Sequence, residues 1–402
     1  MKIRLFRSDV SRRSPHIPLD IRSFITTSLC CFLKDWSNHM QWEREKAPRG
    51  YWGPTKIRNS HRAPRCCLPL LLIAVSVTCQ GFATQHGGAA GPKVKMDPQV
   101  QAVLDKMATA GVLSPTTLEE AKKTYSFYTT LEGPPEPVFH VEDRQIPGPE
   151  GNLTVRIYVP QSRENLPVFV YFHGGGFVAG GLDTHDVPLR AITNRCDCIV
   201  VSVAYRLAPE HPYPAATADA YEATAWIAEH ASDLGGDSRR IAVGGDGAGG
   251  NLATVVTVKA RDRGSPNLIY QVLIYPMTDA SALWHTWWWE SPEPAGSREV
   301  RDVVLGLYVP AKKDLKDPLV SPVYANLKGL PPVLILTDEY DPTLDQAKRY
   351  ARQLRKTGVP TTLMRYPQMV HGFFLMAGQL DAGKDSINQI ASALKNVFKR
   401  AD

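Results

Sequence analysis

Five short apolar runs, separated by helical patterns, limit what this chain can fold into. They occupy residues 168–172, 199–203, 241–243, 269–275 and 333–336. Apolar runs without polar alternation are typical of parallel strands that are covered on both faces. The repeated order of strand, helix and strand predicts an α/β fold with a mostly parallel sheet and right-handed crossovers. In such sheets, ligands and catalytic groups gather at the carboxyl ends of the strands.

Apolar spacing also predicts helices at both ends of the folded region. The last helix has one apolar face, formed by Ile387, Ile390, Leu394, Val397 and Phe398. These positions recur at steps of three and four residues, which is the spacing of an α-helix. Two short helices are predicted before the sheet, marked by Leu104, Met107 and Ala108 and then by Ala121 and Tyr125. Ser114 or Thr116 is expected to cap the second of them.

The positive charge of the chain is concentrated near its beginning. Residues 1–92 contain 14 Lys and Arg against 5 Asp and Glu, a net charge of +9, whereas the remainder contains 32 against 35, a net charge of −3. The body of the protein therefore lacks the basic surface that nucleic-acid binding requires. The 402 residues, 43% hydrophobic and 21% charged, also exclude wholesale disorder and a small disulfide scaffold.

The basic first part has the features of an export signal. Arg58, Arg62 and Arg65 precede an apolar stretch at 68–77, and small residues follow before Thr84. This pattern predicts a secretory signal peptide, and the stretch is too short to span a bilayer. We expect a leader at 1–83, a linker at 84–96 and a folded domain at 97–402. The expected location is periplasmic or secreted.

The leader has alternative interpretations. The segment before the apolar stretch is far longer than the basic region of an ordinary signal peptide, which favours a translation start downstream of Met1. Lipidation of Cys79 is one alternative, and a cytoplasmic tail that associates with a membrane is another. If the leader is an artefact, the protein is cytoplasmic.

Cysteines are scarce in the body of the protein. Five of the seven lie in the leader, and only Cys196 and Cys198 follow it. Two cysteines do not make a disulfide framework. A C-x-C pair at the start of an apolar run predicts buried strand thiols rather than a metal site or a redox pair.

A glycine-rich loop follows the predicted strand at 168–172. It runs His173-Gly174-Gly175-Gly176-Phe177. Three consecutive glycines allow backbone N–H groups to converge without side chains in the way, as an oxyanion hole requires. A plain tight turn is the structural alternative, but a histidine before three glycines and an aromatic residue favours the catalytic interpretation.

A second glycine-rich loop, at 245–252, lies between the strand at 241–243 and a predicted helix that runs to about Lys259. This is the setting of a nucleophile elbow, G-x-S-x-G, in which small residues allow a sharp, strained turn. The central position is Gly247, so the elbow has no side chain to act as nucleophile. The G-x-x-x-x-G-K-[ST] pattern is absent, and the glycines at 245, 247 and 250 do not form a clean G-x-G-x-x-G motif in its expected setting, so nucleotide binding is not indicated.

Two further strand ends carry an acid and a base. Asp341 follows the strand at 333–336, and His371 follows an extended run at 361–366. The order elbow, acid, base is that of the hydrolase triad, in which the histidine takes the proton of the nucleophile and the acid orients the histidine. Other carboxylates nearby are Asp338, Glu339 and Asp345. One of these replaces Asp341 if the predicted strand end is wrong by a few residues.

With these motifs the sequence resembles the hormone-sensitive-lipase-like esterases of the α/β-hydrolase fold. The resemblance covers about residues 97–402 and is carried by 173–177, 205–210, 213–215, 245–253, 275–276, 341–342, Asp345 and 371–373. It implies an eight-stranded, mostly parallel sheet flanked by helices, with a cap formed partly by the N-terminal helices. It also implies hydrolysis of short to medium acyl esters without a metal or an organic cofactor.

Position by position, the resemblance assigns Asp341 as the acid, His371 as the base, and the amides of Gly174, Gly175 and Ala248 as oxyanion donors. Members of the family carry a serine where this chain has Gly247. Esterase activity is therefore expected to be absent or very weak. Asp246 is a poor replacement, because its side chain leaves the elbow in another direction. A sequencing error or a deliberate knock-out would leave the same glycine.

An aromatic segment is the second departure from the family pattern. Four of the eight tryptophans lie between positions 284 and 289. In the family this loop helps to form the cap, so Trp284 and Trp287, together with Phe177, are expected to line the substrate pocket. Packing inside the cap is the alternative for the tryptophans.

The sequence therefore predicts an exported carboxylic ester hydrolase with an incomplete elbow, whose partner is a small-molecule acyl ester. The alternative is a catalytically inactive protein that binds a small molecule, as the gibberellin receptors of plants do on a similar plan. The presence of Asp341 and His371 favours the enzyme, since a pure binder has no chemical need for either. A structural protein of the cell surface has little support.

Overall fold

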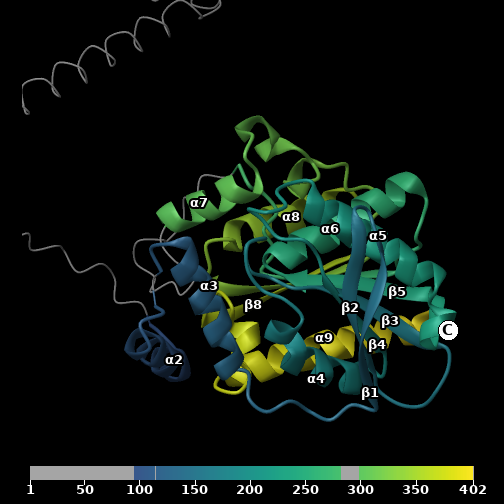
Figure 1. Ribbon diagram of the computed structural model, residues 1–402, viewed down its shortest axis with the longest axis horizontal. Helices are drawn as coiled ribbons and strands as arrows, with labels where there is room; N and C mark the ends of the chain where they lie inside the picture. The colour runs from purple at the N-terminus through teal and green to yellow at the C-terminus, as the bar shows by residue number, and fades with distance from the viewer. Residues whose placement is uncertain (1–94, 114, 282–297, 402) are drawn as a thin grey trace, which may run out of the picture. The chain divides into compact units, whose positions relative to one another are not determined.

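The computed structural model describes residues 95–113, 115–281 and 298–401, and within them eight strands form one sheet (Figure 1). The strands are β1 (His140–Gly148), β2 (Gly151–Val159), β3 (Leu166–Phe172), β4 (Ile199–Ala204), β5 (Gly236–Asp246), β6 (Tyr270–Ile274), β7 (Val333–Tyr340) and β8 (Thr361–Val370). Their spatial order is β1-β2-β4-β3-β5-β6-β7-β8. β2 runs antiparallel to β1 and β4, and the other neighbouring pairs are parallel. The predicted eight-stranded, mostly parallel sheet is confirmed.

The predicted leader at 1–83, with its signal peptide, lies outside the described residues, and so do Trp284 and Trp287. The first described helix is α2 (Pro98–Thr109), which begins where the predicted domain begins. The side chain of Asp97 caps it by accepting a hydrogen bond from the amide of Gln99 at 2.8 Å. In the part of the chain that the structure describes, no helix combines the length and apolar character needed to cross a membrane.

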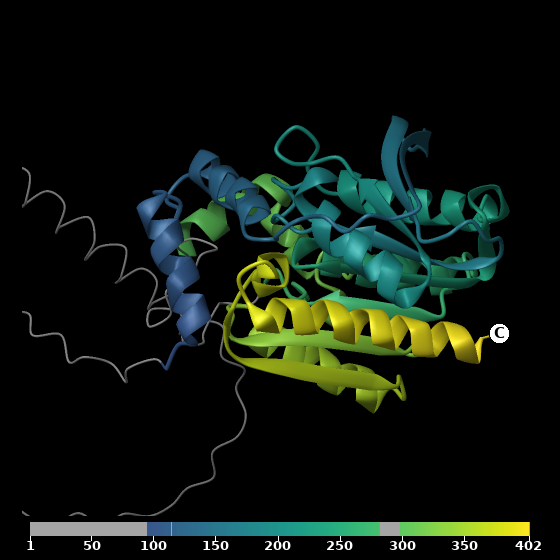
Figure 2. The same cartoon turned by 90° about the horizontal axis from the view of Figure 1, so that it is seen from below.

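Helices cover both faces of the sheet (Figures 1 and 2). The described α-helices after α2 are α3 (Leu118–Phe127), α4 (Asp186–Cys196), α5 (Ala215–Glu229), α6 (Ala248–Arg263), α7 (Arg298–Tyr308), α8 (Leu344–Lys356) and α9 (Asp381–Arg400). α4 and α9 pack side by side on one face, whereas α5, α6 and α8 pack on the other. The predicted apolar face of the last helix is confirmed, because Ile387, Ile390, Leu394 and Phe398 are buried in α9.

Burial on both faces explains the unbroken apolar runs. In β3, Val168 and Val170 belong to the core cluster under α5, α6 and α8, whereas Phe169 and Tyr171 belong to the cluster under α4 and α9. All seven residues of β3 are buried. Each fully buried side chain of this size contributes roughly 1.5–3 kcal/mol to folding relative to an exposed one. This central strand is therefore a stiff support for the loop that follows it.

All the predicted strands except β6 extend beyond the predicted runs, and β6 (Tyr270–Ile274) is one residue shorter than its predicted run at each end. β5 begins at Gly236 rather than at residue 241, and β7 and β8 each continue for four residues past the predicted end, to Tyr340 and Val370. Polar residues pair their backbone groups in a sheet as apolar residues do, so hydropathy alone underestimates strand length. As a result, Gly247, Asp341 and His371 each directly follow a strand, and the carboxyl ends of these parallel strands lie at one edge of the sheet.

The predicted cap of α3 is corrected. Thr117, and not Thr116, caps α3: its side chain accepts from the amide of Glu120, and Glu120 reaches back to the amide of Thr117. This reciprocal pair is a capping box, which satisfies two amides at once. Ser114, the other predicted cap, lies outside the described residues.

The prediction of free buried thiols is wrong. Cys196 ends α4, Cys198 precedes β4, and the two sulfurs form a disulfide. Asp197 between them adopts a left-handed conformation, with φ 59° and ψ 49°, which brings the two Cα atoms to 5.4 Å. Both cysteines are buried, as predicted.

Three helices stand at the carboxyl edge of the sheet. Figure 2 shows α2 and α3 at one end of the sheet, with α7 beside α3. Tyr125 of α3 and Val304 of α7 line the same cavity as residues from the strand ends. The N-terminal helix α3, together with α7, thus covers part of the cavity.

The first turn of α6 packs directly on the end of β3. A Cβ atom at Gly249 would lie 1.8 Å from the carbonyl oxygen of Phe172 and 2.6 Å from that of His173. Both obstacles are backbone atoms, so only glycine fits at this position. The close approach sets the distance between the elbow at Gly247 and the glycine-rich loop after β3.

We predict that Gly249→Ala destabilises the protein by about 1–3 kcal/mol, the usual cost of forcing extra atoms into a packed core. Urea unfolding followed by circular dichroism should show a lower midpoint. The matched control is Gly306→Ala in the exposed part of α7, where a new Cβ meets nothing within 4 Å. This control should be neutral or slightly stabilising. Equal midpoints for Gly249→Ala and the parent would contradict the packing described here.

Candidate active site

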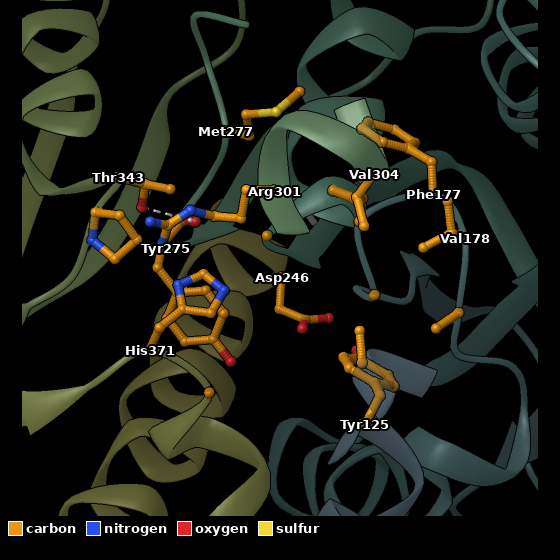
Figure 3. Close-up of a pocket in the computed structure, with 18 of the residues that line it drawn as sticks. Tyr125, Phe177, Val178, Asp246, Tyr275, Met277, Arg301, Val304, Thr343 and His371 are labelled. Carbon is orange, nitrogen blue, oxygen red and sulfur yellow. Dashed lines mark hydrogen bonds between the residues drawn. The ribbon is translucent and has the colours of Figure 1, made fainter. Parts of the chain in front are cut away.

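A cavity of about 180 Å³ lies at the carboxyl edge of the sheet (Figure 3). Loops that follow five strands contribute Gly175, Gly176, Phe177, Asp246, Gly247, Ala248, Tyr275, Met277, Pro342, Thr343, His371 and Gly372 to its lining. Helices α3 and α7 contribute Ala121, Tyr125, Arg301, Val304 and Leu305. Most of these side chains are apolar and a few polar groups converge among them, which is typical of a small-molecule site.

Gly247 forms a sharp turn between β5 and α6. Its backbone dihedrals are φ 51° and ψ −110°, a combination that residues with a side chain rarely adopt. The turn is held by its neighbours: the amide of Gly247 donates to the carbonyl of Ile274 at 2.9 Å, and the amide of Asn251 donates to the carbonyl of Gly247 at 3.1 Å. This is the strained geometry of a nucleophile elbow.

A side chain at position 247 would point at His371. An ideal Cβ built on Gly247 lies 3.6 Å from Nε2 of His371, and no atom outside the neighbouring residues is nearer. The predicted base therefore faces the predicted nucleophile position. The space between them is free for a small side chain.

The predicted acid and base are hydrogen-bonded to each other. Nδ1–H of His371 donates to Oδ2 of Asp341 at 3.0 Å. The other oxygen of Asp341, Oδ1, accepts hydrogen bonds from the amide and the hydroxyl of Thr343. The pair thus leaves Nε2 of His371 directed at the cavity, which is the tautomer that a general base requires.

Electrostatics keep Asp341 ionised. Burial alone would raise the pKa of Asp341, but the charge of His371 and hydrogen bonds from His371, Asp338 and Thr343 hold the pKa below its usual value. The ring of Tyr275 lies 4.4 Å from the His371 ring, between centroids, and covers one side of it. Asp341 is therefore a stable anionic partner for an imidazolium.

The other predicted carboxylates do not take the place of Asp341. Glu339 accepts from the amide of Gln368 at 2.8 Å, and Asp345 is an exposed residue of α8 that lies 3.7 Å from Lys348. Asp338 is fully buried and lies beside the pair. Among the described residues, Asp338, Asp341 and His371 are the one group of His, Cys, Asp and Glu with the spacing to hold a metal ion.

The glycine-rich loop presents two of its three glycines to the cavity. Gly175 and Gly176 line the cavity, as does Ala248 at the first position of α6. The amide of Gly174 donates to Oδ1 of Asp246 at 2.8 Å and is not part of the lining. The expectation that Gly174 faces the substrate is therefore corrected, because its N–H group is already used to hold the loop.

Asp246 is the centre of a buried network that the sequence did not reveal. Its Oδ1 accepts from the hydroxyl of Tyr171 at 2.8 Å and the amide of Gly174 at 2.8 Å, and Nε2 of His185 lies 2.9 Å away. Burial alone would raise the pKa of Asp246, but the charge of His185 and the hydrogen bonds hold the pKa below its usual value. The side chain is thus turned away from position 247, as expected of a residue that does not replace the nucleophile.

His173, the first residue of the glycine-rich loop, is a neutral structural residue. Burial beside His185 lowers the pKa of His173 to about 4. Its ring stacks on Tyr205 with 4.3 Å between centroids, and the hydroxyl of Tyr205 donates to its carbonyl at 2.7 Å. These contacts anchor the loop at its start.

The wall of the cavity opposite His371 is aromatic and aliphatic (Figure 3). Phe177, one of the predicted pocket residues, is buried and stacks on Tyr308 with 3.6 Å between ring centroids. Val304 and Arg301 of α7 also line the cavity, and no sequence pattern indicated this. Apolar spacing predicts a helix but not the place where the helix docks.

The sheet order, the glycine-rich loop, the strained turn after β5 and the Asp–His pair together define an α/β hydrolase. Residues 169–375 match the family model described as alpha/beta hydrolase fold. The chain belongs to the hormone-sensitive-lipase-like carboxylesterase family of this fold, which confirms the family predicted from the motifs.

Its relatives are esterases by name. Carboxylesterase NlhH of Mycobacterium tuberculosis is 40% identical over 311 residues, which cover 75% of this chain and 97% of that protein. An arylesterase of Saccharolobus solfataricus is 33% identical, with 76% and 99% of the two chains covered. The solved structure of an esterase from Pyrobaculum calidifontis is 38% identical, with a TM-score of 0.70 and coverage of 75% and 98%.

We predict that Asp246→Asn lowers the free energy of unfolding by about 1.5–3 kcal/mol at pH 6, the usual contribution of a hydrogen bond to a charged group. The pKa of Asp246 is lower in the folded protein than in the unfolded chain. The stabilisation that Asp246 provides is therefore complete above its pKa in the unfolded chain, which is about 4. It is lost as the pH falls through the lower pKa of Asp246 in the folded protein.

Urea titrations between pH 2 and pH 6 measure this effect. The difference in free energy of unfolding between the parent and Asp246→Asn should become smaller below about pH 4. Asp183→Asn is the control, because the side chain of Asp183 is 89% exposed. A difference in free energy of unfolding that stays constant, or that becomes larger in acid, would refute the role given to Asp246.

Proposed function

We propose that this protein is a carboxylic ester hydrolase for short to medium acyl chains, and that Gly247 leaves the present sequence with little or no activity. One observation carries the proposal: the Cβ position of residue 247 lies 3.6 Å from Nε2 of His371. A serine hydroxyl at this position comes within hydrogen-bonding reach of the base. The named activities of the relatives support the ester class.

In this mechanism each group of the cavity has one task. His371 takes the proton from the attacking oxygen and returns it to the leaving alcohol. Asp341 holds the tautomer of His371 and stabilises the imidazolium. The amides of Gly175, Gly176 and Ala248 donate to the oxyanion that forms on the carbonyl oxygen. No step requires a metal ion or an organic cofactor.

Glycine at position 247 removes the nucleophile and keeps the turn. Loss of the triad serine typically lowers turnover on the order of a millionfold. The oxyanion donors and substrate binding still give a rate about 10³–10⁴ times that of the uncatalysed reaction in water. A glycine relieves roughly 1–3 kcal/mol of backbone strain that a serine would cause. The present sequence is thus expected to be stable but catalytically weak.

The size of the cavity supports small acyl groups. Its volume of about 180 Å³ is little more than that of an apolar cavity of about 150 Å³ that holds one benzene molecule. The apolar wall around Phe177 and Val304 suits an alkyl chain of a few carbons. Longer chains are expected to react more slowly.

A small-molecule-binding protein is the second candidate. It is supported by Gly247 itself, because the mostly apolar cavity is present without a nucleophile. In that case a small apolar acid or ester binds saturably and is released unchanged. Export of either protein is a separate proposal, supported by the basic and apolar pattern of the leader, and cell fractionation with an antibody to the folded domain tests it.

We predict that Gly247→Ser raises kcat/KM for p-nitrophenyl butyrate by about a thousandfold or more. The rate should fall from the butyrate to the palmitate ester. The unfolding midpoint should fall as well, by an amount equivalent to about 1–3 kcal/mol of backbone strain.

Two controls separate chemistry from shape. Gly247→Ala adds the Cβ atom without the hydroxyl and should gain no activity, and the double variant Gly247→Ser with His371→Gln should lose the gain. Folded Gly247→Ser protein that hydrolyses none of the esters would refute the proposal. Saturable binding of butyrate by that inactive protein would then favour the binding function.

A further inference from the structure

A second carboxyl group lies beside the acid and the base. Asp338 is near the end of β7, opposite Tyr366 of β8 in the sheet register, and its exposed fraction is 0%. One oxygen of Asp338, one oxygen of Asp341 and one ring nitrogen of His371 all lie within 4.8 Å of one another. The mechanism above gives Asp338 no task, although burial of a charged carboxylate is costly unless it is paired.

The contacts of Asp341 indicate which carboxyl group is ionised. Its two oxygens accept three hydrogen bonds, one from His371 and two from Thr343. Hydrogen bonds of this kind favour the charged form of a carboxylate. Asp341 is therefore the anion of the pair.

An oxygen of Asp338 lies within 4.8 Å of an oxygen of Asp341, and hydrogen bonding from Asp338 is one of the causes that hold the pKa of Asp341 below its usual value. An ionised carboxylate has no hydrogen to donate, so such a bond exists only when one of the two groups is protonated. Two buried carboxylates whose oxygens lie within 4.8 Å of each other repel strongly when both are ionised, so one of them keeps its proton. Since Asp341 is the anion, the proton belongs to Asp338.

The other groups around Asp338 agree with this assignment. His371 offers a single positive charge. Burial raises the pKa of Tyr275 well above its usual value, so its phenol is neutral and brings no charge to this group. On the neighbouring positions of β7 and β8, Glu339 and Arg365 lie 3.9 Å apart and form their own ion pair.

We propose that Asp338 is a positioning residue: it keeps its proton and donates it in a hydrogen bond to Asp341, which holds the Asp341 carboxylate ionised and aimed at His371. The inference rests on the proposed roles of Asp341 and His371 in ester hydrolysis. The donated hydrogen bond withdraws charge from Asp341, so it also moderates how strongly Asp341 holds the proton on His371.

Two replacements at 338 separate a donor from an anion. Asp338→Asn keeps a hydrogen-bond donor of the same shape, whereas Asp338→Leu removes it and leaves an apolar side chain of similar shape. If Asp338 is a donor, the titration midpoint of His371 stays in place in Asp338→Asn. In Asp338→Leu it moves to higher pH, by about one unit, because Asp341 then attracts the imidazolium more strongly.

The measurement is an NMR titration of the histidine Cε1–H signals of the Gly247 protein, which needs no turnover. The chain has 11 histidines, and His371→Gln identifies the signal of His371 by its loss. Asp345→Asn, at an exposed position of α8, is the matched control and should leave the titration midpoint of His371 unchanged. A midpoint that falls in Asp338→Asn overturns the proposal, because Asp338 would then be an anion, and so does a midpoint that fails to rise in folded Asp338→Leu. If Asp338→Leu does not fold, Asp338→Asn alone decides.

The Gly247→Ser background provides a second readout. There the acid limb of the kcat/KM profile should move to higher pH in Asp338→Leu and stay in place in Asp338→Asn. If Gly247→Ser hydrolyses no ester while the NMR midpoints move as expected, the ester hydrolase proposal fails and the proton on Asp338 stands. If Gly247→Ser hydrolyses esters while the NMR midpoints of both folded variants stay in place, the donor role of Asp338 fails and the hydrolase proposal stands.

Discussion

The hydrogen bond between His371 and Asp341 is the interaction on which the whole site depends. The two residues follow β7 and β8, which are parallel neighbours in the sheet, so the pairing of the strands brings the side chains together. The bond uses Nδ1 of the ring, and Nε2 lies 3.6 Å from the Cβ position of residue 247. Without it, neither the tautomer nor the direction of the base would be set.

A second buried network holds the other half of the site. Asp246 ends β5 and binds the amide of Gly174, so the elbow and the glycine-rich loop are locked to each other through one carboxylate. His185, from the turn before α4, and Tyr171, from β3, complete the network. None of these contacts involves the side chain of residue 247. The architecture of a hydrolase site is therefore expected to persist whichever residue occupies the elbow.

The sequence predicted the parts of the site that follow from strand order. Asp341 stands after an apolar run and His371 after an extended run, and parallel strands end at one edge of the sheet, so their meeting was predictable. The tasks of the backbone amides in the glycine-rich loop were not predictable from the sequence. Whether Gly174 faces the cavity is decided by Asp246, which is 72 positions away in the sequence. Such a contact leaves no local pattern.

Other differences between the sequence-based predictions and the structure have the same physical origin. The capping box at Thr117 depends on which of two adjacent threonines adopts an extended backbone. The disulfide between Cys196 and Cys198 depends on the left-handed turn at Asp197. Val304 reaches the cavity because α7 docks beside α3. Each of these depends on tertiary packing or on one backbone dihedral, which hydropathy and spacing do not report.

Covalent labelling tests most directly whether position 247 faces a working base. The reagent is a p-nitrophenyl alkylphosphonate, and peptide mass spectrometry locates the adduct in the Gly247→Ser protein. An adduct on residue 247 that disappears when His371 is replaced by glutamine is the expected result. No adduct on folded protein, or an adduct at residue 247 that forms equally fast without His371, would contradict the assignment.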